Sequence, residues 1–380
     1  MPARDHLLRI HRDLYTRFRS NARRTAGELS PRLRRYFLEY QKEFTDYKGI
    51  SSRDELVRTL LSADIFVCGD YHTLPAAQKT VAQLIKEAYP GWQAAGKRPL
   101  LFLEMLSPRE DRVVVRYLSG EIDEKAFLKS VRFQKNWGFD WQNYRPLFVF
   151  AKEQGFLIRG LNCPPSKKKA SLEQRDRFAA KVLVEGIQQA PDHVAIALLG
   201  DLHLASSHLP LQIDQYLSKK GAQRRVVVVH QNRERLYWKL AAQGLEHKVE
   251  VVELKKDTFC VLNTPPWVKL QSYLRWVDWP AEELRDRDSG VYEEEFFDLA
   301  KTIQAFIGSA SPLSDAFEIL WKTKTEEVSL RGQGALRELL VQNLGSYFIP
   351  RKKTVLLTSP SINGAATQAA LYLHAAMSQR

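Results

Sequence analysis

The feature that most constrains the fold is an alternation, from residue 64 onward, of short apolar runs with longer amphipathic stretches. The runs have the length of strands, and the stretches between them carry apolar residues at helical spacing. Because the runs are continuously apolar, we expect strands buried on both faces, as in a parallel sheet covered by helices. The expected strands are 64–68, 99–105, 156–161, 194–199, 226–229, 249–254 and 258–262.

The chain of 380 residues is long enough for one large core and an appended region. We predict an α/β protein with a mostly parallel sheet flanked by helices on both faces, and with helical N- and C-terminal extensions. The expected divisions are a basic helical extension at 1–55, the α/β domain at 56–280 and a mostly helical region at 281–380. Within the last region, 352–380 is expected to add one strand and one helix.

The net charge of +13 is concentrated near the N-terminus, where residues 1–53 hold 13 Lys and Arg against 6 Asp and Glu. Such a segment can lie on nucleic acid or on an anionic membrane surface. A solvated basic face on a helical extension is the simpler interpretation, so a partner of this kind is only weakly indicated.

The cysteines and the hydropathy indicate the compartment. Cys68, Cys163 and Cys260 are odd in number and form no CxxC pair, which argues against a disulfide framework or a thiolate zinc site. No apolar stretch approaches the roughly 18 residues of a membrane span, and the first residues show no signal peptide or lipobox. We therefore expect a soluble, cytoplasmic protein.

The pattern Gly-Asp-x-His occurs twice, each time where an expected strand ends. "FVCGDYHTLP" supplies Asp70 and His72, and "ALLGDLHLAS" supplies Asp201 and His203. Residues two apart in an extended segment point to the same side, so each carboxylate and imidazole can face one crevice together. A carboxylate beside an imidazole fixes its tautomer, which suits a metal ligand or a general base equally well.

Three further polar residues follow expected strands at the same edge, where open parallel sheets bind ligands. Glu104 ends the second strand, Asn162 follows the third and His230 follows the fifth. We therefore expect these residues and both Gly-Asp-x-His motifs to share one cleft. The sequence contains no GxGxxG after a strand and no GxxxxGK[ST], GxSxG or HExxH, so nucleotide binding, serine hydrolysis and zincin chemistry lack their local signatures.

These motifs, together with "LEM" at the end of the second strand and "WQNYRPLFVFAKEQGFLIRGLNCP" at 141–164, resemble the ChaN-like haem-binding proteins of bacteria. That family belongs to a superfamily that also includes the Tiki-type metalloproteases and the erythromycin esterases. The resemblance covers about residues 60–280, and it implies an α/β fold with an iron-porphyrin ligand.

Position by position, the resemblance places the site histidines of the superfamily on His72 and His203 and its acidic residue on Glu104. These residues would activate a water in the esterase branch, ligate a metal in the Tiki branch, and line a haem pocket in the ChaN branch. Tyr71 and Tyr144 are the candidates for a tyrosine ligand to haem iron. With Asp70, Asn162, Asp201 and His230 they complete the expected binding residues.

The sequence departs from the family pattern in two ways. Asp70 stands where the usual first motif has Glu, and its side chain is one methylene shorter. The lipoprotein signal of the usual ChaN-like protein is also absent, which counts against a role at the cell envelope.

Three interpretations remain open. The first is a haem-binding protein, in which the basic run Lys167–Lys169 would neutralise the haem propionates. The second is a hydrolase, with or without a divalent metal ion, that uses His72, His203 and Glu104 on water. The third is a scaffold that recruits a partner through its terminal regions. Whether the chain is an enzyme and whether it forms a homodimer stay open.

Overall fold

The computed structural model describes residues 3–164 and 170–278, together with short pieces at 297–298, 300–305, 318–321, 346–349, 354–357 and 369–373. The chain divides into two compact units, Met1–Asp278 and Trp279–Arg380. The sequence motifs described above all belong to the first unit.

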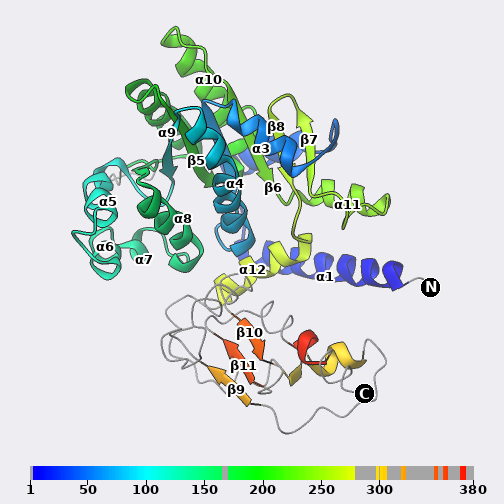
Figure 1. Ribbon diagram of the computed structural model, residues 1–380. Helices are drawn as coiled ribbons and strands as arrows, with labels where there is room; N and C mark the ends of the chain where they lie inside the picture. The colour runs from blue at the N-terminus through cyan, green and yellow to red at the C-terminus, as the bar shows by residue number, and fades with distance from the viewer. Residues whose placement is uncertain are drawn as a thin grey trace. The chain divides into compact units, whose positions relative to one another are not determined.

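The first unit is built on an eight-stranded sheet in the order β1-β7-β8-β6-β2-β5-β3-β4. Figure 1 labels four of these strands, β5, β6, β7 and β8. The six strands from β8 to β4 run parallel to one another, whereas β7 is antiparallel to both of its neighbours. The strands are β1 (Gly49–Ser51), β2 (Ile65–Asp70), β3 (Arg98–Leu103), β4 (Leu157–Gly160), β5 (His193–Gly200), β6 (Val226–Gln231), β7 (Val251–Lys255) and β8 (Thr258–Val261). The predicted mixed α/β fold with a mostly parallel sheet is confirmed, and every expected strand is present within a few residues.

Helices cover both faces of this sheet. The first face carries α3 (Arg53–Leu61), α4 (Pro75–Ala94), α5 (Asp111–Leu118), α6 (Glu124–Ser130), α7 (Phe133–Asn136) and α8 (Trp141–Gln154), and the short 3₁₀ helix η1 (Pro108–Glu110) directly precedes α5. The second face carries α9 (Leu172–Gln189), η2 (Asp201–Leu204), α10 (Leu209–Lys219) and α11 (Glu234–Ala242).

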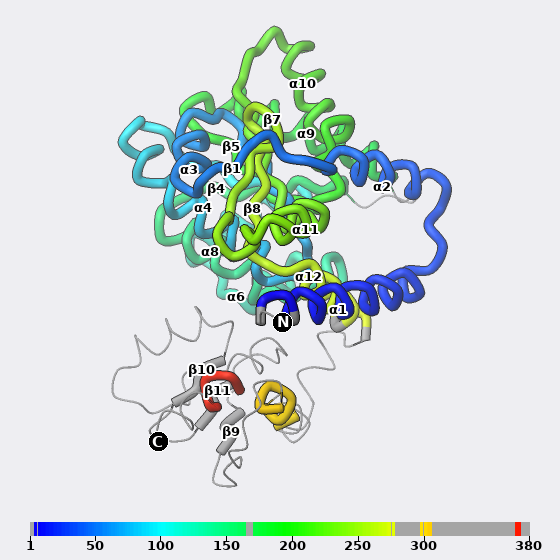
Figure 2. The backbone as a smooth tube through the Cα atoms, turned by 90° about the vertical axis from the view of Figure 1, so that its right-hand side faces the viewer, coloured from blue at the N-terminus to red at the C-terminus, as the bar shows by residue number. Residues whose placement is uncertain are grey.

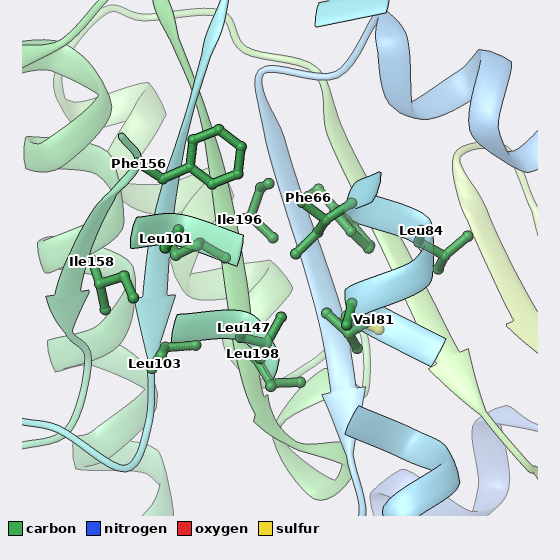
Figure 3. Packing of buried hydrophobic residues seen from close by; sticks show 14 of the residues in the cluster. Phe66, Val81, Leu84, Leu101, Leu103, Leu147, Phe156, Ile158, Ile196 and Leu198 are labelled. Carbon is green, nitrogen blue, oxygen red and sulfur yellow. The ribbon is translucent and has the colours of Figure 1, made fainter. Parts of the chain in front are cut away.

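The core follows the pleat of the strands, since successive side chains point to opposite faces. In β2, Phe66 and Cys68 pack with α3, α4 and α8, whereas Ile65 and Val67 pack with α9 and α10. Figure 3 shows the first of these layers, in which Phe66 of β2 and Val81 of α4 lie close together. The continuous apolar runs of the sequence are therefore explained by burial on both sides.

The N-terminal segment contains two helices, α1 (Ala3–Ala26) and α2 (Pro31–Glu43), as expected for the basic extension. Helix α1 runs beside α12 (Pro266–Asp278) in both views (Figures 1 and 2). The short strand β1 pairs with β7, so the sheet already begins within the segment that was expected to be only helical. Its three residues are too few to show a strand pattern in the sequence.

The described parts of the second unit include a three-stranded sheet in the order β10-β11-β9. Its strands are β9 (Glu318–Trp321), β10 (Ser346–Ile349) and β11 (Thr354–Leu357), and residues 297–298, 300–305 and 369–373 are helical. The strand and helix expected in 352–380 correspond to β11 and to 369–373, whereas β9 and β10 were not anticipated. The other residues of the expected helical region lie outside the described part of the chain.

No helix among the described residues is long and apolar enough to cross a membrane. The three cysteines are free, and Cys68 and Cys260 are buried within the sheet.

Candidate functional site

The site lies where three neighbouring parallel strands end. Strand β5 runs between β2 and β3, and its last residue, Gly200, is the register partner of Asp70 at the end of β2. On its other side, β5 pairs with β3 up to Leu103, directly before Glu104. The sheet topology therefore brings the ends of β2, β3 and β5, followed by the Gly-Asp-x-His motifs and Glu104, to one edge.

Asp70 orients His72 on the β2 side of the site. Nδ1 of His72 lies 2.8 Å from Oδ2 of Asp70, and the Tyr144 hydroxyl donates a hydrogen bond of 2.8 Å to the same oxygen. The Gln78 amide donates to the other carboxylate oxygen. Because the carboxylate can only accept, Nδ1 of His72 carries the proton and Nε2 is turned toward Glu104.

His203 is oriented in the same way, but by a residue that the sequence interpretation did not name. Its Nδ1 lies 2.6 Å from Oδ1 of Asp176 on α9, and the Tyr36 hydroxyl on α2 donates a hydrogen bond of 2.8 Å to Oδ2 of Asp176. The side chain of His203 is almost fully buried. A second Tyr–Asp–His chain thus faces the first one across the site.

The expected pairing of Asp201 with His203 does not form. Asp201 instead binds Nζ of Lys269 at 3.0 Å, and the Arg233 guanidinium lies 3.8 Å from the same carboxylate oxygen. The reason is local, because Asp201 begins the 3₁₀ helix η2, with three residues per turn. Residues two apart then no longer point to the same side, as they would in a strand.

Glu104 lies between the two imidazoles. Its Oε2 is 3.8 Å from Nε2 of His72, and its Oε1 is 3.7 Å from Nε2 of His203. The Gly200 amide donates a hydrogen bond of 2.6 Å to this carboxylate, and Arg175 forms an ion pair with it. The result is a near-symmetric row of Asp, His, Glu, His and Asp.

The charges in this row shift the pKa values of its members. Burial raises the pKa of Glu104, but His203, His72 and Arg175 lower it more, so the net pKa is below its usual value. Burial lowers the pKa of His72, but the charge and hydrogen bond of Asp70 and the charge of Glu104 raise it above its usual value. The site therefore holds an ionised glutamate beside an imidazole that takes up a proton readily.

An aromatic wall, made of Trp137, Phe139, Tyr273 and Trp276, borders the site next to His72. The rings of Trp137 and Phe139 lie 4.6 and 4.9 Å from the imidazole of His72, and Trp276 stacks on Phe139 at 4.8 Å. All four side chains are partly exposed, and 23% of the His72 side chain is exposed. His72 is thus the one of the two imidazoles that solvent reaches.

A small pocket of about 10 Å³, room for about one water molecule, lies on the other side, next to His203. Its lining consists of Glu104, Leu161, Asn162, Arg175, Ala179, Leu199 and His203. Asn162, expected at the strand edge, therefore borders His203 rather than His72. The pocket is smaller than the roughly 300–1,000 Å³ typical of ligand sites.

The other candidate residues lie around this centre. Tyr144 is fully buried, and burial first, then Asp70, raises its pKa well above the usual value, so it keeps its proton. Burial and Asp201 likewise raise the pKa of Tyr71, and Nζ of Lys269 lies 4.6 Å from its ring centre. His230 is fully buried against Phe44, and burial lowers its pKa to about 4.

Four residues that hold the polar centre were not found from the sequence, namely Tyr36, Gln78, Arg175 and Asp176, and neither was the aromatic wall. A signal for Asp176 exists, because it falls in register with the buried apolar stripe of α9 at positions 179, 180, 183 and 184. A carboxylate on such a stripe needs a buried partner. The expected basic run at 167–169 lies outside the described residues. Within the described residues, no group of three or more His, Cys, Asp or Glu side chains is arranged to hold a metal ion.

The fold and the site together define an α/β protein whose polar centre lies at the carboxyl edge of a parallel sheet. Residues 56–175 match the family model described as haem-binding uptake, Tiki superfamily, ChaN. This segment of the chain is therefore similar to that family, as the resemblance in the sequence implied. It includes His72, Glu104, Tyr144 and Arg175.

Among solved structures, the fold is similar to ChaN of Campylobacter jejuni with cofacial haem binding, at 16% identity and a TM-score of 0.39, covering 49% of this chain and 92% of that one. The type III effector HopBA1 matches at 12% identity and a TM-score of 0.35, and the match covers 50% of this chain and 87% of that one. The toxin effector domain RRSP of Vibrio vulnificus matches at 18% identity and a TM-score of 0.30, and the match covers 46% of this chain and 39% of that one. No curated protein matches the sequence.

Proposed function

We propose that this protein binds haem at the carboxyl edge of its sheet, with Nε2 of His72 as a ligand of the iron. The observation that carries the proposal is a partly exposed imidazole, oriented by Asp70, beside the aromatic wall. The match of 56–175 to a haem-binding family supports the same ligand class.

The residues fit an iron porphyrin in kind. A porphyrin is flat and largely apolar, and partly exposed rings such as Phe139 and Trp276 offer a surface for its face. The small pocket beside His203 is too small to hold a porphyrin, so we place the porphyrin on the His72 side. The exposed basic residues Arg132 and Lys135, just before Trp137, would pair with the propionates.

The residues behind His72 would prepare it as a ligand. Asp70 holds the Nδ1 proton, which keeps Nε2 as the donor atom and makes it more basic. Tyr144 and Gln78 in turn hold Asp70. Bound haem would supply an iron centre whose affinity and potential depend on this ligand and its surroundings.

Titration of the purified protein with haemin, followed by visible absorption, tests the proposal. We expect a saturable Soret shift, and Trp276→Ala should weaken binding by about five- to tenfold, as expected for the loss of an aromatic contact. Trp238→Ala is the matched control, since Trp238 packs on Tyr15 and Tyr237 and not on the wall. A featureless titration, or equal effects of the two variants, would contradict the proposal.

A hydrolase is the second candidate, favoured by the position of Glu104 between two imidazoles. One imidazole would take a proton from water, and the hydroxide formed would attack an ester carbonyl. The imidazolium, stabilised by Glu104, would then return the proton to the leaving alcohol as the ester C–O bond breaks. Hydrolysis of p-nitrophenyl acetate, with and without added Zn²⁺, tests this by comparing the wild type with Glu104→Gln. A rate that Glu104→Gln leaves unchanged would rule out this chemistry for the site.

A further inference from the structure

We infer that Tyr36, on the N-terminal helix α2, is a positioning residue for His203 and acts through Asp176. Tyr36 lies outside the segment that matches the family model. The role assigned to Tyr36 rests on the second candidate function, the hydrolase, because it takes His203 to be a working part of the edge site.

The contacts of Tyr36 support this role directly. Only 3% of Tyr36 is exposed, and its hydroxyl donates to Oδ2 of Asp176 at 2.8 Å and lies 3.1 Å from Nδ1 of His203. The other oxygen of Asp176 accepts from Nδ1 of His203. The hydroxyl therefore holds the carboxylate in the orientation that presents Nε2 of His203 to Glu104, 3.7 Å away.

The same arrangement exists on the other side of Glu104, which strengthens the assignment. Tyr144 donates to Asp70, and Asp70 accepts from Nδ1 of His72. In both Tyr–Asp–His arrangements a buried tyrosine hydroxyl donates to an aspartate. The pKa values of Tyr36 and Tyr144 are both raised, chiefly by burial and next by the neighbouring aspartate. Both phenols thus stay protonated and act as donors.

Helix α2 is held in place by the segments that carry His203 and Asp176. The ring of Tyr36 stacks on His208 at 3.6 Å, and Nε2 of His208 lies 3.1 Å from Oε2 of Glu39. Glu43 accepts a hydrogen bond of 2.6 Å from the Ser206 amide. These contacts fix the register of α2 on residues 201–208, so the Tyr36 hydroxyl is held where Asp176 needs a donor.

The test uses ligand-free protein labelled with ¹⁵N-histidine. The chain has nine histidines, so the spectrum contains few signals. The Nδ1–H signal of His203 is assigned by its loss in His203→Gln. We expect Tyr36→Phe to speed exchange of this proton with water by about fivefold or more, because one hydrogen bond that orders Asp176 is lost. Tyr40→Phe is the matched control, since the buried Tyr40 hydroxyl, on the same helix, has no hydrogen-bond partner among the described residues.

A double-mutant cycle with Asp176→Asn adds the readout that a merely structural role would not give. If Tyr36 acts through Asp176, Tyr36→Phe should have no further effect on the His203 signal in the Asp176→Asn background. Equal exchange in wild type, Tyr36→Phe and Tyr40→Phe would overturn the inference. If Tyr36→Phe does not fold, Asp176→Asn alone decides, because an unchanged His203 signal there would show that the relay is not needed. The exchange measurement uses no haemin, so a failure of haem binding would not affect its interpretation.

Discussion

Asp70 accepts its 2.8 Å hydrogen bond from His72 while Tyr144 and Gln78 donate to the same carboxylate. The shorter side chain at this position therefore does not leave the carboxylate without partners. It places the carboxylate behind the imidazole, where it orients His72 and does not face Glu104. The departure from the family's usual Glu is thus compatible with a supporting role for Asp70.

Replacing Asp70 by Asn should destabilise the fold by about 2–3 kcal/mol, because a buried carboxyl group that accepts from three donors is lost. Asp192→Asn is the matched control, since Asp192 also contacts a histidine, His193, but is 63% exposed. We expect the control to leave the free energy of unfolding nearly unchanged, because Asp192 lies at the surface. Urea denaturation of the three proteins measures the difference, and similar values for both variants would contradict the role of Asp70.

Tyr144→Phe should cost about 1–2 kcal/mol in the free energy of unfolding, since it removes one hydrogen bond to Asp70. The position of the Soret band with haemin bound should not change, because the buried, protonated Tyr144 supports Asp70 and is not the iron ligand. The same titration as for the wild type checks this. A shifted band would instead indicate ligation by Tyr144.

Gly160→Ala should be strongly destabilising, by about 3 kcal/mol or more, because a Cβ atom there would clash with the backbone of Ser107. Gly160 also donates its amide proton to Asp111 at 2.8 Å, and it places Asn162 at the edge of the small pocket. Gly49→Ala is the control, since a Cβ at this other strand glycine would meet no atom of the described residues within 4 Å. Equal free energies of unfolding for the two variants would show that β4 can shift away from Ser107.

His230 should make stability depend on pH between about 6.5 and 4. Its pKa is lowered to about 4 by burial, against about 6.5 when unfolded, so the unfolded state binds more protons in this window. Stability should therefore fall by up to about 3 kcal/mol as the pH falls through the window, and no further below it. The carboxylates of Glu43 and Asp201 moderate the shift, whereas Lys255 and Lys269 add to it.

Comparison with His230→Leu isolates this contribution from the other titrating groups. Between pH 7 and pH 4, the free energy of unfolding of the variant should fall by about 3 kcal/mol less than that of the wild type. Urea denaturation at several pH values measures both slopes. Parallel curves for the two proteins would contradict a neutral, buried His230.

The sheet could be predicted from the sequence because burial on both faces leaves a continuous apolar signal, as in "VAIALL" of β5. Placing Asp70, His72 and Glu104 at one edge needed only the rule that parallel strands end together. The partner of His203 could not be predicted in this way, since η2 changes the direction of Asp201 and Asp176 comes from a helix. Tyr36 reaches the site from a separate helix, and no local pattern indicates such a contact.

The most direct test of the central claim is the haemin titration of His72→Ala beside His193→Ala. Both variants remove an imidazole next to an aspartate, but only His72 lies at the aromatic wall. We predict a saturable Soret shift near one haem per chain for the wild type and for His193→Ala, and a loss of at least about tenfold in affinity for His72→Ala, as expected when an iron ligand is removed. A wild-type protein that gives no saturable shift, or a His72→Ala variant that binds haemin as tightly as the wild type, would contradict the account.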